Sequence, residues 1–399
     1  MNVILFDDPK RENLLPFTYT RPASELRLGI YTIREKWENW LSLKASNFTE
    51  DYLSRKFPLK TADHNLMING RVLPSIELLH QIKSLKKNEQ VVFNGTLVAV
   101  WITEKELITF KSQQLPGKQS IEAKAPIIEV EYPWHIFQYN GDQIRLDYEW
   151  ICKRNRSLPI VDKHTRVYCP ENVFLEEGAS VKAAILNAEN GPIYLGKNST
   201  VEEGVIIKGP FALGDHSTIN MNARMRGDIS VGPHCKVGGE VSNSVFIAFS
   251  NKGHDGFLGN SVIGEWCNLG ADTNTSNLKN NYANVKLWNF GEERFVDTGL
   301  TFCGLMMGDH TKCGINTMFN TGTITGVSAN IFGSGFPRTL IPSFAWGGSS
   351  GFSTFQLKKA FETAEKMMER RGIVLDDIEK EILTYVFEET AKNRIWESK

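Results

Sequence analysis

A six-residue hydrophobic period between residues 193 and 241 restricts the possible folds of this chain more than any other feature. The repeated position is aliphatic or methionine at eight successive steps: Leu195, Val201, Ile207, Leu213, Ile219, Met225, Val231 and Val237. Such residues make up roughly a quarter of an average chain, so chance produces this run on the order of once in ten thousand or less. The residue two places earlier is always apolar or small, as strand alternation requires: Ile193, Ser199, Val205, Phe211, Ser217, Ala223, Ile229 and Cys235.

A helix cannot satisfy a period of six, whereas a β-solenoid with one short strand and one corner per hexad does. The residue after the repeated position is glycine at 196, 214, 232 and 238, which suggests corners that need an unusual backbone angle. The phase resumes later, at Ile263, Leu269, Met307, Cys313, Phe319 and, imperfectly, Ile331. The sequence therefore predicts a parallel β-helix with a polar excursion at 271–300, and long loops on a rigid scaffold often carry function.

This pattern resembles the hexapeptide-repeat family of left-handed β-helices, in which three hexads form one triangular coil. The left hand is implied by the resemblance, because the general preference for crossovers is right-handed.

The segments on either side of the repeat have a different residue pattern, which predicts strands and helices. The segments VILF (3–6) and VVFNGTLVAVWI (91–102) suggest strands, and one face of an amphipathic helix collects Ile30, Ile33, Trp37, Trp40 and Leu41. A capping box at 353–356 and a stop at 372 predict a helix over 354–371, and a second should begin at Asp376 or Asp377. We expect an α/β domain at 1–158, a β-helix at 159–350 and helices at 351–399 that cap the solenoid or pack on a neighbour.

Composition excludes several classes of function. The chain has 399 residues and a net charge of -1, so it has no basic excess for nucleic acid or anionic lipid. The first apolar run meets Asp7 and Asp8 too soon for a signal peptide or a membrane span. The cysteines include no C-x-x-C pair, which argues against a zinc site and a disulfide framework: Cys152, Cys169, Cys235, Cys267, Cys303 and Cys313. We expect a cytoplasmic protein with a small-molecule substrate, reduced thiols, and no nucleic-acid or membrane partner.

Three histidines, His216, His234 and His310, share one position of the repeat, and the first two are separated by three hexads and should stack. Such a column is compatible with a metalloenzyme similar to the γ-class carbonic anhydrases, which share the β-helix. However, the position is an outward-facing corner without a matching carboxylate or third ligand, so we favour a structural role.

His254 differs, because it falls where the phase breaks. The segment HDGFLGNSVIG (254–264) resembles H-x-x-Y-L-G-x-x-x-I-G in the acetyltransferase domain of the bifunctional N-acetylglucosamine-1-phosphate uridyltransferase/glucosamine-1-phosphate acetyltransferase family. NLGADT (268–273) is similar to its N-I-G-A-G-T, RMR (224–226) resembles its R-L-R, and Asn277 stands at its next asparagine.

The resemblance implies that His254 is a general base, which takes a proton from an acceptor amine or hydroxyl attacking an acyl-coenzyme A, with acetyl-coenzyme A as the first expectation. Asn268 and Asn277 would orient the acceptor or the base, and a backbone or amide donor near residue 270 would stabilise the oxyanion. Arg226, with Arg224 beside it, would bind an anionic part of the acceptor.

The chain also departs from that family. Phe257 replaces a tyrosine and is expected to contact the substrate, Leu278 replaces another tyrosine, and the family's phosphate-binding lysine has no counterpart in 239–244. These departures argue against a sugar 1-phosphate acceptor, while acyl transfer to another sugar or sugar phosphate remains the prediction.

The first domain resembles a second family. LLPFTYTRP (14–22) resembles the P-L-T-Y-T-R-P run of sugar-phosphate nucleotidyltransferases, and RPASELRLGIYTIREKW (21–37) resembles GlmU-like sugar nucleotidyltransferases that carry a β-helix. Such enzymes place a G-x-G-T-R loop after the first strand to bind the triphosphate, but residues 7–13 contain no glycine. Nucleotidyl transfer is therefore expected to be degenerate. The candidate nucleotide-binding residues are Lys10, Arg11, Arg21 and Arg27, and the candidate Mg²⁺ ligands are Asp7 and Asp8.

The leading hypothesis is thus a sugar-modifying transferase with an acyltransferase β-helix. Solenoids of this family form trimers, so the resemblance implies a homotrimer in which residues 271–300 complete a neighbour's site. A second hypothesis is a non-catalytic sugar-nucleotide-binding or regulatory trimer. The missing glycine loop and the missing lysine favour it, and the intact His254 segment opposes it.

Overall fold

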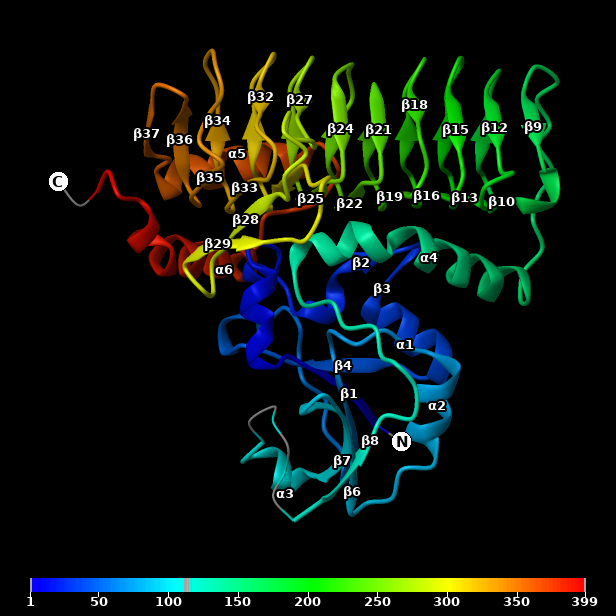
Figure 1. The fold of residues 1–399 in the computed structure, drawn as a ribbon, viewed down its shortest axis with the longest axis vertical. Helices are drawn as coiled ribbons and strands as arrows, with labels where there is room; N and C mark the ends of the chain where they lie inside the picture. Colours follow the sequence, from blue (N-terminus) through cyan, green and yellow to red (C-terminus); the bar gives the residue numbers. More distant parts are fainter. Residues whose placement is uncertain (1, 111–112, 114, 116, 398–399) are drawn as a thin grey trace. The chain divides into compact units, whose positions relative to one another are not determined.

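The computed structural model describes residues 2–110, 113, 115 and 117–397 and contains two compact units (Figure 1). One unit comprises Met1–Leu26 and Tyr31–Tyr132, and the other comprises Arg27–Ile30 and Pro133–Lys399. The predicted class is confirmed: an α/β domain, a left-handed parallel β-helix and carboxy-terminal helices. The predicted domain boundaries at residues 158 and 350 stay predictions.

The first unit is built on a six-stranded mixed sheet in the order β4-β1-β5-β7-β6-β8. The strands are β1 (Asn2–Phe6), β4 (Ala45–Phe48), β5 (His64–Asn69), β6 (Glu89–Phe93), β7 (Thr96–Thr103) and β8 (Gln119–Glu122). The strands expected at 3–6 and 91–102 are present, and the turn between β6 and β7 uses Asn94 and Gly95 at positive φ. The helices are α1 (Ile33–Leu41), α2 (Ile76–Lys83) and α3 (Glu104–Leu107).

Helix α1 differs from the expected helix at its start. A capping box formed by Thr32 and Glu35 sets its first turn, so Ile30 lies outside the helix. Ile33 and Trp37 are fully buried, as the amphipathic pattern predicts.

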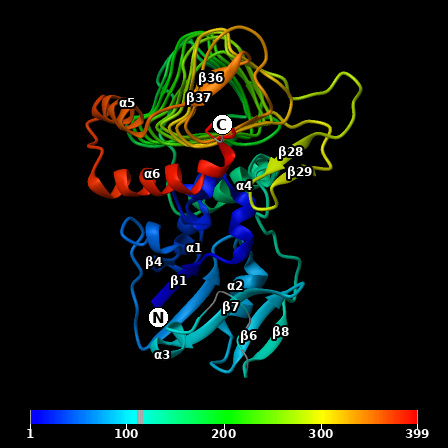
Figure 2. The ribbon, with the colours of Figure 1, turned by 90° about the vertical axis from the view of Figure 1, so that its left-hand side faces the viewer.

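The second unit is a three-sided solenoid, and Figure 2 shows its triangular cross-section. Sheet 1 contains β10 (Val173–Leu175), β13 (Ile193–Leu195), β16 (Phe211–Leu213), β19 (Ile229–Val231), β22 (Val245–Ala248), β25 (Val262–Glu265), β30 (Leu305–Met307), β33 (Thr323–Thr325) and β35 (Leu340–Ile341). Sheet 2 contains β11 (Ser180–Val181), β14 (Thr200–Val201), β17 (Thr218–Ile219), β20 (Lys236–Val237), β23 (Asn251–Lys252), β26 (Asn268–Leu269), β31 (Lys312–Cys313), β34 (Asn330–Ile331), β36 (Ala345–Gly348) and β37 (Gly351–Thr354). Sheet 3 contains β9 (Arg166–Tyr168), β12 (Ile185–Asn187), β15 (Ile206–Lys208), β18 (Arg224–Met225), β21 (Glu240–Ser242) and β24 (Phe257–Gly259), with β27 (Asn274–Thr275) and β32 (Met318–Phe319) paired separately.

The repeat positions form the core of this solenoid. Every predicted inward residue from Ile193 to Val237 is buried, with at most 2% exposure. Four of the six cysteines, Cys235, Cys267, Cys303 and Cys313, are buried free thiols that fill part of this core.

The corner glycines serve a different purpose from the expected one. None of the glycines at 196, 214, 232 and 238 has a positive φ; that conformation falls two positions later, at Asn198, His216 and His234. A Cβ on Gly232 would lie 1.8 Å from the carbonyl oxygen of Ile247 in the next coil. These glycines therefore allow neighbouring coils to approach closely.

The polar excursion begins later than residue 271, because β27 still continues the coil. It contains the antiparallel hairpin β28 (Lys286–Asn289) and β29 (Arg294–Asp297). The Cys303 N–H donates to the Asn277 carbonyl at 2.9 Å and closes the excursion where it leaves and rejoins the solenoid.

Helix α4 (Pro133–Cys152) lies along the solenoid (Figure 1). Its Asn140 Oδ1 accepts from Ser230 Oγ at 2.8 Å, and its Nδ2 donates to the Asp228 carbonyl at 3.0 Å. Among the described residues, no helix is both long and apolar enough to cross a bilayer.

The predicted helix over 354–371 has the wrong start. Ser353 belongs to β37, which pairs antiparallel with β36, and α5 spans only Leu357–Glu369. A strand edge at the end of the solenoid is thereby paired, an advantage that a local capping motif cannot reveal. The expected stop at Gly372, with φ of 68°, and the second helix, α6 (Asp377–Glu389) capped by Asp376, are confirmed.

Candidate active site

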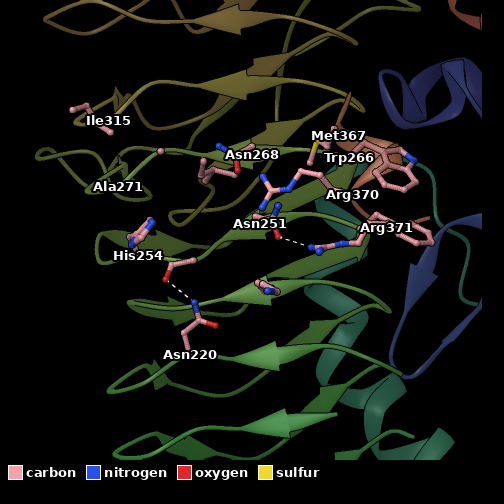
Figure 3. A pocket seen from close by; sticks show the side chains of 15 residues that line it. Asn220, Asn251, His254, Trp266, Asn268, Ala271, Ile315, Met367, Arg370 and Arg371 are labelled. Atoms are coloured by element: carbon pink, nitrogen blue, oxygen red, sulfur yellow. Dashed lines mark hydrogen bonds between the residues drawn. The ribbon is translucent and has the colours of Figure 1, made fainter. Parts of the chain in front are cut away.

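A cavity of about 410 Å³ lies on the outer face of sheet 2, beside α5 (Figure 3). His254 and Asn268, the two predicted catalytic residues, both line it. The structure therefore brings together residues that the sequence separates by one coil of the solenoid.

His254 lies in a tight bend, residues 253–256, between β23 and β24, where the chain turns from sheet 2 to sheet 3. Its side chain is exposed. Every carbonyl oxygen of the bend accepts a hydrogen bond; in chain order the donors are Asn220 Nδ2 (2.8 Å), Lys252 Nζ (2.8 Å), Asp272 N (3.0 Å) and Glu240 N (3.3 Å). The backbone that carries the imidazole is therefore fixed at each residue.

The floor of the cavity is a row of side chains on adjacent strands. Lys236, Asn251 and Asn268 are consecutive partners in the parallel ladder of sheet 2. Alternation places them all on the outer face, because the next residue of each strand points into the core. Asn251 Oδ1 accepts a hydrogen bond from Arg371 Nη2 at 3.0 Å, which ties the strand to the carboxy-terminal segment (Figure 3).

The cavity is strongly cationic. Its cations are Lys236, Arg370 and Arg371, and its lining, all of it within the described residues, contains neither aspartate nor glutamate. Phe249 and Trp266 supply an apolar wall at the opposite corner. Such a surface suits a ligand that carries phosphate groups beside an apolar part.

Arg370, Arg371 and Met367 were missed by sequence reasoning, which gave the carboxy-terminal helices a capping or packing role. Two arginines at the end of a helix are also what the helix dipole favours, so the pair carries no distinct signal. Only the docking of α5 on sheet 2 shows that these side chains face His254.

The predicted acceptor-binding residues lie on the neighbouring face. Arg226 Nη1 is 2.8 Å from Glu240 Oε1, and Arg224 Nε is 3.6 Å from Glu240 Oε2. Phe257 is the ladder partner of Glu240 on sheet 3. His254 therefore stands at the corner between the cavity on sheet 2 and this group on sheet 3.

Asn277 is not brought to His254. His254 precedes its strand of sheet 3, whereas Asn277 follows β27, so the two lie toward opposite ends of neighbouring strands. The Asn277 Nδ2 donates to Asn260 Oδ1 at 2.8 Å, and its carbonyl closes the excursion. These two contacts give Asn277 a structural role at the base of the excursion.

The histidine column is part of a stacked aromatic ladder at the corner between sheets 1 and 2. Successive ring centroids are 5.0, 4.9, 4.3 and 6.3 Å apart, through His216, His234, Phe249, Trp266 and His310. Trp266 thus packs within this ladder. Burial, aided by the charges of His216 and Arg371, lowers the pKa of His234. No group of three or more potential metal ligands occurs in the part of the chain that the structure describes.

In the first unit, the acidic pair after β1 is engaged by its own domain. Asp8 Oδ1 accepts a hydrogen bond from Arg71 Nε at 2.7 Å. Asp8 Oδ2 accepts from Arg71 Nη2 at 2.6 Å and from Asn69 Nδ2 at 2.9 Å. Asp7 accepts from the Ala23 N–H at 2.9 Å and from Thr49 Oγ1 at 2.6 Å. Each of the four carboxylate oxygens already accepts a hydrogen bond, and Arg71 is completely buried. This arrangement does not fit a magnesium site.

The comparisons with known proteins agree with these observations in part. Residues 3–156 match the family described as "Sugar nucleotidyl transferase". The first part of the chain is similar to the sugar nucleotidyl transferases. The resemblance predicted for this segment is thereby confirmed.

Two further proteins are similar to the chain. A "Bifunctional protein GlmU" of Methanocaldococcus jannaschii is 34% identical over 87 residues, which are 22% of this chain and 21% of the relative. The match thus spans about a fifth of that relative's length. A solved structure titled "Crystal Structure of the polySia specific acetyltransferase NeuO" matches 50% of this chain and 86% of its own, with 15% identity and a TM-score of 0.25.

The predicted cations of the sugar nucleotidyl transferase-like segment have varied surroundings. Lys10 forms an ion pair with Glu131, and Arg11, in a short 3-10 helix (Pro9–Leu14), is buried with its Nε 3.3 Å from Asp7 Oδ2. Arg21 is also buried. Arg27 belongs to the second unit, where its Nε donates to the Ile247 carbonyl at 3.1 Å.

Proposed function

We propose that the protein is a transferase of sugar-nucleotide metabolism whose β-helix transfers an acyl group from acyl-coenzyme A to a sugar or sugar phosphate. Acetyl-coenzyme A is the first donor to test. The observation that carries the proposal is one cavity lined by His254, Asn268, three cations and no carboxylate.

In the proposed reaction, the imidazole of His254 takes a proton from an amine or hydroxyl of the acceptor. The acceptor nitrogen or oxygen then bonds to the thioester carbonyl carbon, the carbon–sulfur bond breaks, and the coenzyme leaves as its thiol once protonated. Asn268 orients the acceptor or the base. Ala271 lines the same cavity, and its N–H, which donates to no group among the described residues, is the proposed oxyanion donor.

We propose that the acyl donor and the acceptor bind on opposite sides of His254. Lys236, Arg370 and Arg371 would bind the phosphates of the donor in the cavity, because guanidinium and ammonium groups pair with phosphate. Arg224 and Arg226, exposed on sheet 3, would bind an anionic part of the acceptor.

We include a homotrimer in the proposal. Apolar side chains remain exposed on the strands of sheet 3 and on β32 beside them, and burial against another subunit would cover them: Ile185, Ile206 and Met318. A partner on this face would also enclose the proposed acceptor side.

For the sugar nucleotidyl transferase-like segment, we propose ligand binding without magnesium-dependent transfer. The engagement of Asp8 by Arg71 supports this. Thermal shifts with nucleoside triphosphates and with sugar phosphates, each with and without Mg²⁺, test it. A shift that requires Mg²⁺, or nucleotidyl product, would contradict it.

The decisive experiment for acyl transfer is a thiol-release assay with acetyl-coenzyme A and a panel of amino-sugars, sugars and their phosphates. The His254→Ala variant should lose roughly 10²–10⁴-fold in kcat. His164→Ala, another exposed histidine of the same unit, is the matched control and should retain activity. No release with any acceptor, or equal release by His254→Ala, would favour the non-catalytic binding or regulatory protein.

A further inference from the structure

One residue behind the candidate site has no role in the proposed reaction and is unusual in its place. Lys252 occupies an inward position of the solenoid, in register with the core residue Val237 of the preceding coil. Its side chain is only 1% exposed. An ammonium group in such a position loses its hydration and must find hydrogen-bond acceptors within the protein.

The fold provides a fitted space for this ammonium. Lys252 Nζ donates to the Gly238 carbonyl at 3.1 Å and to the His254 carbonyl at 2.8 Å. A Cβ on Gly239, whose φ is +74°, would lie 2.7 Å from Nζ and 2.9 Å from the His254 carbonyl oxygen. Two consecutive glycines therefore leave room for the ammonium and for the bend that it contacts.

The contact is made with the backbone of the candidate base. The other three hydrogen bonds of the bend hold the carbonyls of Gly253, Asp255 and Gly256, so within the described part of the chain Lys252 alone fixes the carbonyl of His254. Two of these remaining three bonds come from backbone N–H groups of neighbouring coils, which any sequence would supply.

We propose that Lys252 is a positioning residue for His254: its buried ammonium holds the 253–256 bend from inside the coil and thereby aims the imidazole at the cavity. This inference rests on the proposed acyl transfer. An apolar residue usually stabilises such a core position at least as well as a buried charge does. A role in orienting the base gives a reason for a lysine at this point, because small displacements of catalytic groups cost rate.

The chain contains a matched control. Lys312 lies on β31 of the same sheet, and its Nζ also donates to a nearby backbone carbonyl, that of His310, at 2.8 Å. That carbonyl belongs to the aromatic corner and not to the bend. Lys312 lies in the outward row of the sheet, in register with Asn268, whereas Lys252 points inward. Lys312→Met therefore removes another ammonium-to-carbonyl hydrogen bond of the same sheet without touching the support of His254.

The experiment compares the full-length chain with Lys252→Met, Lys252→Gln and Lys312→Met. Amide hydrogen exchange of residues 253–256 is measured by mass spectrometry, and kcat and KM by thiol release. We expect Lys252→Met to exchange at least tenfold faster in the bend and to lose at least tenfold in kcat, with KM for the acyl donor within about twofold. Lys252→Gln, which keeps an uncharged NH₂ donor group, should be intermediate, and Lys312→Met should match the wild type in both measurements.

Unchanged exchange in both Lys252 variants, or an equal loss of kcat in Lys312→Met, would overturn the positioning role. If Lys252→Met does not fold, the Gln variant carries the comparison. Absence of thiol release by the wild type would refute acyl transfer itself, whereas the exchange data would still decide whether Lys252 fixes the bend.

Discussion

The buried Lys252 should give this protein an unusual dependence of stability on pH. Burial lowers the pKa of Lys252 from 10.5 to about 8; the charges of Asp255, Cys313 and Asp272 oppose this shift, and that of Arg224 adds to it. Below about pH 8, both the folded and the unfolded chain hold the proton, and the folded state carries the full cost. Between about pH 8 and 10.5, the folded chain has released a proton that the unfolded chain still binds, so stability rises with pH.

The size of the effect follows from the shift. Each pKa unit is worth about 1.36 kcal/mol, so a fall from 10.5 to about 8 corresponds to roughly 3 kcal/mol, most of it recovered by pH 10. The buried thiols act in the opposite direction. Burial raises the pKa of Cys235 and Cys303 from 9.0 to about 12, so the folded chain keeps protons that the unfolded chain loses above pH 9. The wild-type profile alone therefore mixes both effects.

The difference between the wild type and Lys252→Met isolates the lysine, because the thiols are common to both. Guanidinium unfolding of the two proteins at pH 7, 8, 9 and 10 gives the free energy of unfolding at each pH. The wild type should gain roughly 2–3 kcal/mol relative to the variant between pH 7 and 10. Parallel profiles, or a gain by the variant, would show that the ammonium is not buried in the folded chain and would refute the reasoning.

Three further substitutions test other contacts by the same unfolding measurement. Arg71→Met should cost about 3–5 kcal/mol because it leaves Asp8 buried without its partner, and adding Asp8→Leu should recover part of that loss. Gly232→Ala should cost about 1–3 kcal/mol, because its Cβ would meet a carbonyl oxygen at 1.8 Å, whereas Gly314→Ala, with its nearest atom at 3.5 Å, should be neutral. Trp266→Ala should cost about 3–5 kcal/mol by opening the aromatic ladder. Equal losses of stability in the two glycine variants would contradict the close approach of the coils. An Arg71→Met variant as stable as the wild type would contradict the burial of the Asp8 pair, and a Trp266→Ala cost well below about 3 kcal/mol would contradict the packing of the aromatic ladder.

The solenoid was predictable from the sequence because its contacts repeat at a fixed separation. Ile219 pairs with Val201 in the preceding coil and with Val237 in the following one, each three hexads away, so one local pattern specifies every neighbour. The same logic fails at the carboxy-terminal end. Ser353 has the local signature of a cap, yet its strand pairs with β36, and that tertiary pairing overrides the local preference.

The candidate site was predictable only as far as it is local. His254 and Asn268 belong to one continuous motif on adjacent coils, so recognising the motif places both. Arg370 and Arg371 lie much further along the chain, and no local pattern encodes where α5 docks. Their contribution to the cavity is visible only in three dimensions.

Lys252 shows how the irregularity of the solenoid bears on its function. The two coils before Val237, from Val201 to Ile219 and from Ile219 to Val237, each repeat after three hexads. Val237 pairs with Lys252 before three hexads have passed, so stepping by six from Val237 misses the lysine. The next coil, from Asn251 to Asn268, also falls short of three hexads, and the one after it contains the excursion. Coils of irregular length also occur toward both ends of the solenoid, and the ones in its middle carry His254, its supporting lysine and Asn268. A regular coil would place an apolar or small residue at every inward position and a standard corner after it, and it would supply neither the bend nor the ammonium that holds it. The shortened coil from Val237 to Lys252 therefore places the break in phase directly before the bend that carries the proposed base.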